Sequence, residues 1–165
     1  MYSTSFTGWE NFFVASAGAA AAVAGLLFVV LSINLAPILK GPGFASRAGE
    51  TFIPVAVTLI ISLLALVPGH AIKVFGVEPI IIGGSVWMVS SLTQIRAFRA
   101  LHFKRLWHFV FRLLVNEPAN LAIIVAGFSL VTGFPGVLYW LFPAIILAFT
   151  GTMANAWVLP AEILR

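Results

Sequence analysis

The sequence has no cysteine and very few charged residues. The lack of cysteine excludes disulfide bonds, thiolate metal sites and cysteine nucleophiles. Charged residues make up only 8% of the 165 residues, whereas hydrophobic residues make up 61%. Soluble domains average roughly 25% charged residues, so this chain could not cover a surface exposed to water. Because lipid-facing side chains are apolar, we expect an integral membrane protein with a single transmembrane domain over residues 1–165.

Enzyme signatures are also missing. The chain contains no HExxH, GxSxG or Walker A motif. Its histidines, His70, His102 and His108, fall in the connecting segments, so they form no intramembrane pair that could ligate haem. We therefore expect no catalysis and no bound cofactor or metal. Five of the nine Lys and Arg residues form a local basic patch within a net charge of +4, which is not a nucleic-acid-binding composition.

Long apolar runs dominate the chain. A helix needs about 20 mainly apolar residues to cross ~30 Å of hydrocarbon. Proline and glycine fall between the runs, where helices are expected to break. The expected spans cover about residues 11–39, 51–67, 79–95, 118–134 and 137–159. The predicted fold class is therefore all-α, a polytopic membrane bundle of five transmembrane helices.

The distribution of basic residues predicts the orientation of this bundle. Five of the nine Lys and Arg residues lie between Arg96 and Arg112. With the N-terminus outside, these five, Lys40, Arg47 and Arg165 are cytoplasmic, and only Lys73 is external. Cytoplasmic loops of membrane proteins carry an excess of Lys and Arg. We therefore expect the N-terminus outside and the C-terminus inside.

A basic amphipathic segment is expected between the third and fourth spans. On a helix over residues 103–114, Lys104, Arg105, His108 and Arg112 share one side, and apolar residues occupy the other. Such a segment is suited to the cytoplasmic headgroup region. Its basic side either anchors the topology or contacts an anionic lipid or an acidic partner.

The first span carries a long run of small residues, in which Gly18, Ala22 and Gly25 share one helix face. Small residues let helix backbones approach closely, and in lipid this packing drives helix association. The face is a candidate helix-packing surface, used either within the chain or between subunits.

Amide side chains are predicted to reach a similar depth near the cytoplasmic side. The candidate polar inner layer consists of Asn34, Gln94, Asn120 and Asn155, one from each of four spans. Polar groups at membrane depth usually face the protein interior or a cavity. They form either interhelical hydrogen bonds or a hydrated inner vestibule.

The N-terminal third also carries a recognisable pattern. It comprises WENFF at residues 9–13, the Ala/Gly run at 15–25, LSINL at 31–35, GPG at 41–43 and RAGE at 47–50. With these segments the chain resembles small multi-pass bacterial membrane proteins, mostly uncharacterised, some of which are labelled modulators of the FtsH protease. The resemblance implies a bacterial inner-membrane location and supplies no active-site motif.

Three function classes fit these features. The first is a homo-oligomeric channel or permeation pathway, in which subunits associate through the small-residue face. The second is an accessory subunit or modulator of a larger membrane complex, such as a membrane protease. The third is a small transporter of an apolar or lipid-like molecule. The expected partners are the lipid bilayer and either a second copy of the chain or another membrane protein.

Overall fold

The computed structural model describes residues 8–40, 44–100, 106–134 and 137–163. All regular elements within these ranges are helical. In chain order they are α1 (Glu10–Ile33), α2 (Leu35–Lys40), α3 (Phe44–Ala65), α4 (Ile72–Ala100), α5 (Leu106–Thr132), the 3-10 helix η2 (Val137–Trp140) and α6 (Leu141–Ile163).

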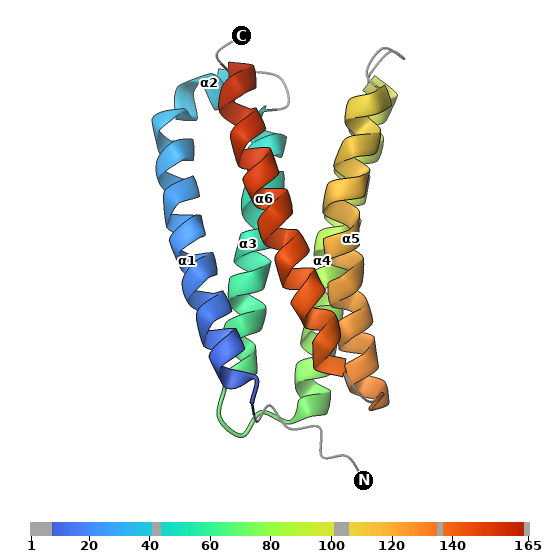
Figure 1. The fold of residues 1–165 in the computed structure, drawn as a ribbon. Helices are drawn as coiled ribbons and strands as arrows, with labels where there is room; N and C mark the ends of the chain where they lie inside the picture. Colours follow the sequence, from blue (N-terminus) through green and yellow to red (C-terminus); the bar gives the residue numbers. More distant parts are fainter. Residues whose placement is uncertain (1–7, 41–43, 101–105, 135–136, 164–165) are drawn as a thin grey trace.

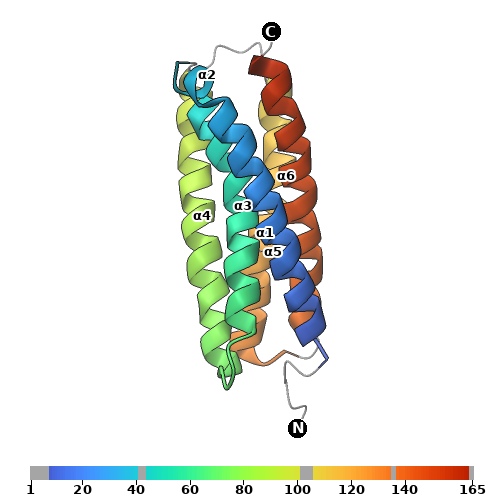
Figure 2. The same cartoon turned by 90° about the vertical axis from the view of Figure 1, so that its left-hand side faces the viewer.

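The long helices α1, α3, α4, α5 and α6 run side by side in alternating directions (Figure 1). Short elements mark the two ends of this bundle. The α2 end is where α3 and α5 begin, and the η2 end is where α1, α4 and α6 begin. Figure 1 shows α4 and α5 as a pair beside the group formed by α1, α3 and α6, and in the view of Figure 2 helices α1 and α3 lie in front of α5.

Four helical stretches are long and apolar enough to cross a membrane, namely Glu10–Ile33 (α1), Ala48–Ala65 of α3, Ile72–Ile95 of α4, and Leu138–Ala156, which joins the end of η2 to α6. The apolar part of α5, Pro118–Thr132, is shorter. The chain is therefore an all-helical bundle of the membrane type, with four to five apolar helices able to span a bilayer.

The helices do not begin at the prolines where the sequence predicts breaks. Pro79 and Pro118 lie inside α4 and α5, which start at Ile72 and Leu106. Helices in membrane proteins tolerate proline because neighbouring helices and local adjustments satisfy the freed backbone groups. The predicted first span divides instead at Asn34, the C-cap of α1, before the short helix α2.

The predicted interfacial segment also differs. Residues 106–114 form the first turns of α5 and continue into its apolar part, so no separate helix is formed there. Lys104 and Arg105 lie outside the described residues, and the side chains of His108 and Arg112 lie outside the described side chains.

The apolar core lies toward the η2 end. The buried cluster combines Phe13 of α1, Ile61 of α3, Phe75 of α4, Leu130 of α5 and Leu141 of α6. Trp9 extends it, since its ring lies 5.0 Å from that of Tyr139 in an edge-to-face arrangement. Aromatic pairs of this geometry add about 0.5–1.5 kcal/mol beyond the area that they bury. This end of the bundle is therefore closed by packed side chains.

Glycines bring α4 and α5 into close contact. A Cβ atom at Gly127 would lie 2.7 Å from the carbonyl oxygen of Gly76, and one at Gly76 would lie 2.8 Å from the Cβ of Leu130. A Cβ at Gly83 would meet the Cγ2 of Ile123 at 3.0 Å. Because no side chain separates the backbones here, α4 packs more extensively on α5 than on α3, its neighbour in sequence.

Candidate ligand-binding cavity

A cavity of about 420 Å³ lies between α3, α4 and α5. Small-molecule pockets typically have volumes of roughly 300–1,000 Å³, so this one is large enough for a small ligand. Its lining residues are Gly49, Glu50, Ile53 and Pro54 of α3, Ser85, Val86, Val89, Ser90 and Thr93 of α4, and Asn120 of α5.

The cavity exists because α3 and α4 are joined in sequence but packed on different partners. The tight glycine contact holds α4 against α5, while α3 packs mainly on α1 and α6. Several of the residues that line the space between α3 and α4 are small, namely Gly49, Ser85 and Ser90, and the larger ones beside them leave the cavity open.

The polar residues of the lining gather near the α2 end. Three of them lie close in sequence to the charged ends of the apolar stretches. Glu50 lies three residues after Arg47, Thr93 three residues before Arg96, and Asn120 three residues after Glu117. Ser85 lies eight positions before Thr93 on α4, which is roughly 12 Å deeper at 1.5 Å per residue. The cavity therefore runs from a polar rim toward mid-length along the bundle, where it is open at the surface, since Ser85 and Val89 are exposed.

Hydroxyl groups of the lining donate to their own helix. The Ser85 hydroxyl donates to the carbonyl oxygen of Ile81 at 2.6 Å, and the Thr93 hydroxyl donates to that of Ser90 at 2.8 Å. A hydroxyl oxygen has two acceptor lone pairs in addition to its single proton. Ser85 and Thr93 therefore present acceptors to the cavity.

The structure brings part of the predicted polar inner layer to this cavity. Asn120 is buried and lines it. Gln94 is also buried, and its side-chain amide donates to the hydroxyl oxygen of the lining residue Ser90 at 2.9 Å. Asn34 instead donates to the carbonyl oxygen of Val30 on its own helix, and Asn155 is half-buried on α6.

Glu50 was missed as a site residue by the sequence reasoning. The predicted second span began at residue 51, whereas α3 begins at Phe44 and places Glu50 inside the helix, with its side chain half-buried. The sequence does show an acidic residue directly before a predicted span. Whether Glu50 lines a site depends on which helices lie opposite it, and this cannot be read from the sequence.

The predicted packing face of the first span is not used within the chain. Gly18, Ala22 and Gly25 are all exposed, and a Cβ atom at Gly18 or Gly25 would meet no other atom within 4 Å. Helix α1 packs through a neighbouring face that buries Phe13, Ala17 and Ala20. The small-residue face is therefore open on the surface of the single chain.

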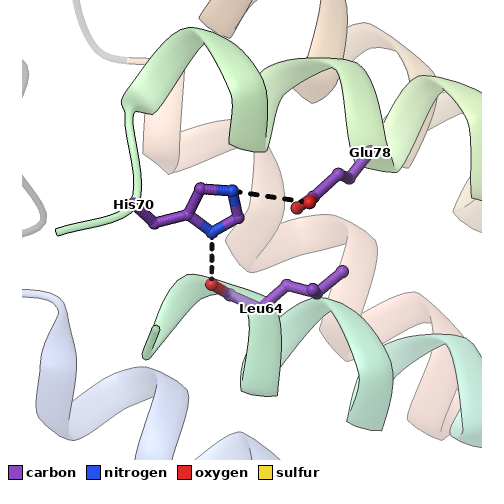
Figure 3. A network of polar contacts seen from close by, with 3 residues as sticks. All are labelled: Leu64, His70 and Glu78. Atoms are coloured by element: carbon purple, nitrogen blue, oxygen red, sulfur yellow. Dashed lines mark hydrogen bonds and ion pairs between the residues drawn. The ribbon is translucent and has the colours of Figure 1, made fainter. Parts of the chain in front are cut away.

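A second polar network joins the α3–α4 connection to α4 at the η2 end (Figure 3). The Nδ1 of His70 lies 3.0 Å from the carbonyl oxygen of Leu64, and its Nε2 lies 3.4 Å from the Oε1 of Glu78. The ring of His70 also contacts that of Phe75 edge to face, with centroids 6.0 Å apart. No group of three or more potential ligands among the described residues could hold a metal ion.

No protein-family model matches the sequence, and no characterised protein or solved structure shows significant similarity to it. The cavity and its chemistry therefore provide the basis for a functional hypothesis.

Proposed function

We propose that this membrane protein binds, and moves or presents, a small amphipathic molecule in the cavity between α3, α4 and α5. The observation that carries this proposal is the arrangement of the lining, with a polar rim around Glu50, Thr93 and Asn120 and apolar side chains such as Ile53 and Val86. A molecule with a polar head and an apolar tail matches this arrangement. This corresponds to the third function class, a small transporter of a lipid-like molecule.

The predicted orientation places the α2 end on the cytoplasmic side. The cavity then opens near the cytoplasmic headgroups, and a bound amphiphile lies parallel to the lipids of that leaflet. A bacterial inner membrane, implied by the resemblance of the N-terminal third, is the location that we propose.

A pore through one chain fits the packing less well. The interior toward the η2 end is filled by the apolar cluster around Phe13, Phe75 and Leu130. Selective pores line their narrow part with carbonyl oxygens or charged side chains, and this cluster contains only apolar side chains. A channel would therefore have to run between subunits.

The exposed face of α1 supports a second candidate, association with a second copy or with another membrane protein. Only 17% of the apolar window of α1 is buried, against 39% for those of α3 and α6. Contact with another helix through Gly18, Ala22 and Gly25 would bury part of the α1 surface that is exposed in the single chain. This role is compatible with a ligand-binding cavity on the opposite part of the bundle.

Equilibrium binding tests the proposed function. Radiolabelled ten-carbon amphiphiles (decylamine, decanol and decanoate) are added to the protein in lipid nanodiscs, with empty nanodiscs as the partition control. We expect saturable binding of at least one of them and a loss of about tenfold or more in affinity for Val86→Phe, because the larger side chain occupies the cavity.

The matched control is Val77→Phe, at an exposed position of the same helix that does not line the cavity. We expect it to bind like the native chain. Absence of saturable binding, or equal losses for the two variants, would contradict ligand binding in the cavity.

A further inference from the structure

The side-chain amide of Asn120 lines the cavity without a hydrogen-bond partner in the part of the chain that the structure describes. The residue is only 6% exposed. Its amide atoms are nevertheless not among the fully enclosed polar atoms, so they reach the open space of the cavity. Buried polar side chains usually have a hydrogen-bond partner. A ligand in the cavity would supply the partner that this amide lacks.

The packing of α4 on α5 places Asn120 beside hydroxyl groups. The two helices run in opposite directions (Figure 1) and touch at Gly83, where a Cβ atom would meet the Cγ2 of Ile123. Asn120 precedes Ile123 by three residues, so it lies about one turn nearer the α2 end. The turn of α4 at that level begins at Val86 and ends at Ser90, and both of these residues line the cavity.

The hydroxyl groups on α4 offer both donors and acceptors. The Ser90 oxygen accepts from the Gln94 amide at 2.9 Å, which leaves the Ser90 proton as a donor. Ser85 and Thr93, on either side of Ser90 along α4, have donated their protons and present acceptors. With Asn120, which has both kinds of group, these side chains match a ligand head that both donates and accepts.

The uncharged groups of the lining favour an uncharged head. Glu50 already interacts with another group of the chain, so its charge and oxygens are not assigned to a ligand. A buried ion is costly unless an opposite charge pairs with it. Hydrogen bonds between neutral groups carry no such requirement, and they are stronger in a cavity of low dielectric than in water.

Resting on the function proposed above, we infer that the ligand of this cavity is a membrane-partitioning primary amide that binds to Asn120. The ligand carbonyl accepts from the Asn120 side-chain nitrogen, and one ligand N–H donates to the Asn120 side-chain oxygen. The second ligand N–H donates to a hydroxyl oxygen of α4. The apolar body lies along Ile53 and Val86 and reaches the lipid at Val89, which is exposed.

The head group is tested by comparing four ligands with ten-carbon chains on the native protein in nanodiscs. Decanamide supplies donors and an acceptor, N,N-dimethyldecanamide supplies the acceptor alone, decanol supplies one hydroxyl group, and decylamine is a cation. Because each neutral hydrogen bond contributes modestly, we expect decanamide to bind about tenfold more tightly than N,N-dimethyldecanamide and decylamine. Decanol is expected to bind about threefold more weakly than decanamide.

Asn120→Leu assigns the preference to one residue, because leucine keeps the branching of the side chain and removes its amide. Decanamide affinity should fall about tenfold, whereas the affinity for N,N-dimethyldecanamide should change less than about threefold. Asn11→Leu is the matched control, since Asn11 is an exposed amide in the first turn of α1 at the η2 end. It should bind all four ligands like the native chain.

Thermal unfolding without ligand distinguishes recognition from a structural role. Because the Asn120 amide has no partner to lose in the described part of the chain, Asn120→Leu should leave the unfolding temperature unchanged or raise it. A lower unfolding temperature would show that the amide stabilises the bundle, and would overturn its assignment to a ligand.

The outcomes separate the two proposals. If the four ligands bind saturably and equally and Val86→Phe weakens all of them, the cavity binds amphiphiles but the amide inference is wrong. An undiminished preference for decanamide in Asn120→Leu also overturns it, because the methyl groups of N,N-dimethyldecanamide would then be excluded by size alone. If no ligand binds saturably, the proposed function itself fails. Should Asn120→Leu not fold, the comparison of heads on the native chain still decides.

Discussion

At the scale of single residues, the contact between His70 and Glu78 shows how a polar pair is held at the η2 end. A carbonyl oxygen can only accept a hydrogen bond, so the Nδ1 of His70 must carry the proton that it donates to Leu64. The Nε2 faces the Glu78 carboxyl group, whose Oε1 lies 3.4 Å away. The ring therefore links the end of α3 to α4.

Replacing His70 alone should cost more stability than replacing His70 and Glu78 together. His70→Phe keeps an aromatic ring beside Phe75 and leaves the Leu64 carbonyl and the Glu78 carboxyl group without their partner, so we expect a loss of about 2 kcal/mol in the free energy of unfolding. Glu78→Gln should cost less than about 1 kcal/mol, because its amide can donate to the Nε2 of a neutral His70.

A double-mutant cycle measures this coupling. Adding Glu78→Gln to His70→Phe should recover about 1 kcal/mol, since the burial of an unpaired carboxyl group is relieved. The measurement is unfolding of the four proteins in one detergent, followed by circular dichroism. Strictly additive losses would mean that the contact in Figure 3 contributes no coupling.

At the scale of helices, the close approach of α4 and α5 depends on glycine. A methyl group at Gly127 would lie within 2.8 Å of both the Gly76 carbonyl oxygen and the Cγ1 of Ile80. We expect Gly127→Ala to separate the helices and lower the free energy of unfolding by about 1–3 kcal/mol, the usual cost of overpacking. Thermal unfolding in detergent measures this effect.

Gly84→Ala is the matched control for this substitution. A Cβ atom at Gly84 would meet no other atom within 4 Å, and alanine is favoured over glycine in a helix by about 0.8–1 kcal/mol. The control should therefore be neutral or stabilising. If both variants shift the unfolding temperature alike, the glycine contact does not determine how α4 and α5 pack.

The same contact explains why the helices were easier to predict than the cavity. The apolar runs correctly indicated a bundle of apolar helices, because the length and hydropathy of each run can be read from consecutive residues. Proline marked the helix ends unevenly, since Pro79 and Pro118 lie inside helices whereas Pro68 and Gly69 do separate α3 from α4. The cavity forms because α4 packs more closely on α5 than on α3. This packing depends on the contact between Gly76 and Gly127, which are far apart in sequence.

The sequence also could not show which polar side chains bond to another helix and which bond to their own. In a helix, a serine or threonine hydroxyl can donate to the carbonyl three or four residues earlier, as Ser85 does here, and Asn34 uses its amide in the same way. Such a residue needs no partner on another helix. The predicted inner layer therefore contained Asn120 and Gln94 at the cavity together with Asn34, which is satisfied on its own helix.

At the scale of the whole molecule, tight packing at the η2 end and a cavity toward the α2 end divide the bundle into two unlike halves. The core cluster ties α1, α3, α4, α5 and α6 together at one end. The open space lies between the α4–α5 pair and α3 at the other. The cavity therefore lies between these two groups of helices and away from the core cluster.

The exposed small-residue face of α1 leads to a prediction about assembly. We expect the protein, extracted gently from its membrane, to have a native mass corresponding to more than one 17.7 kDa chain or to a fixed ratio with another membrane protein. Gly18→Ile combined with Gly25→Ile should reduce it to the single chain, because branched side chains keep helix backbones apart. Gly84→Ile is the control at an open glycine of α4. A native protein that is already a single chain would show that lipid covers this face, whereas a complex that survives both substitutions would place the interface on another helix.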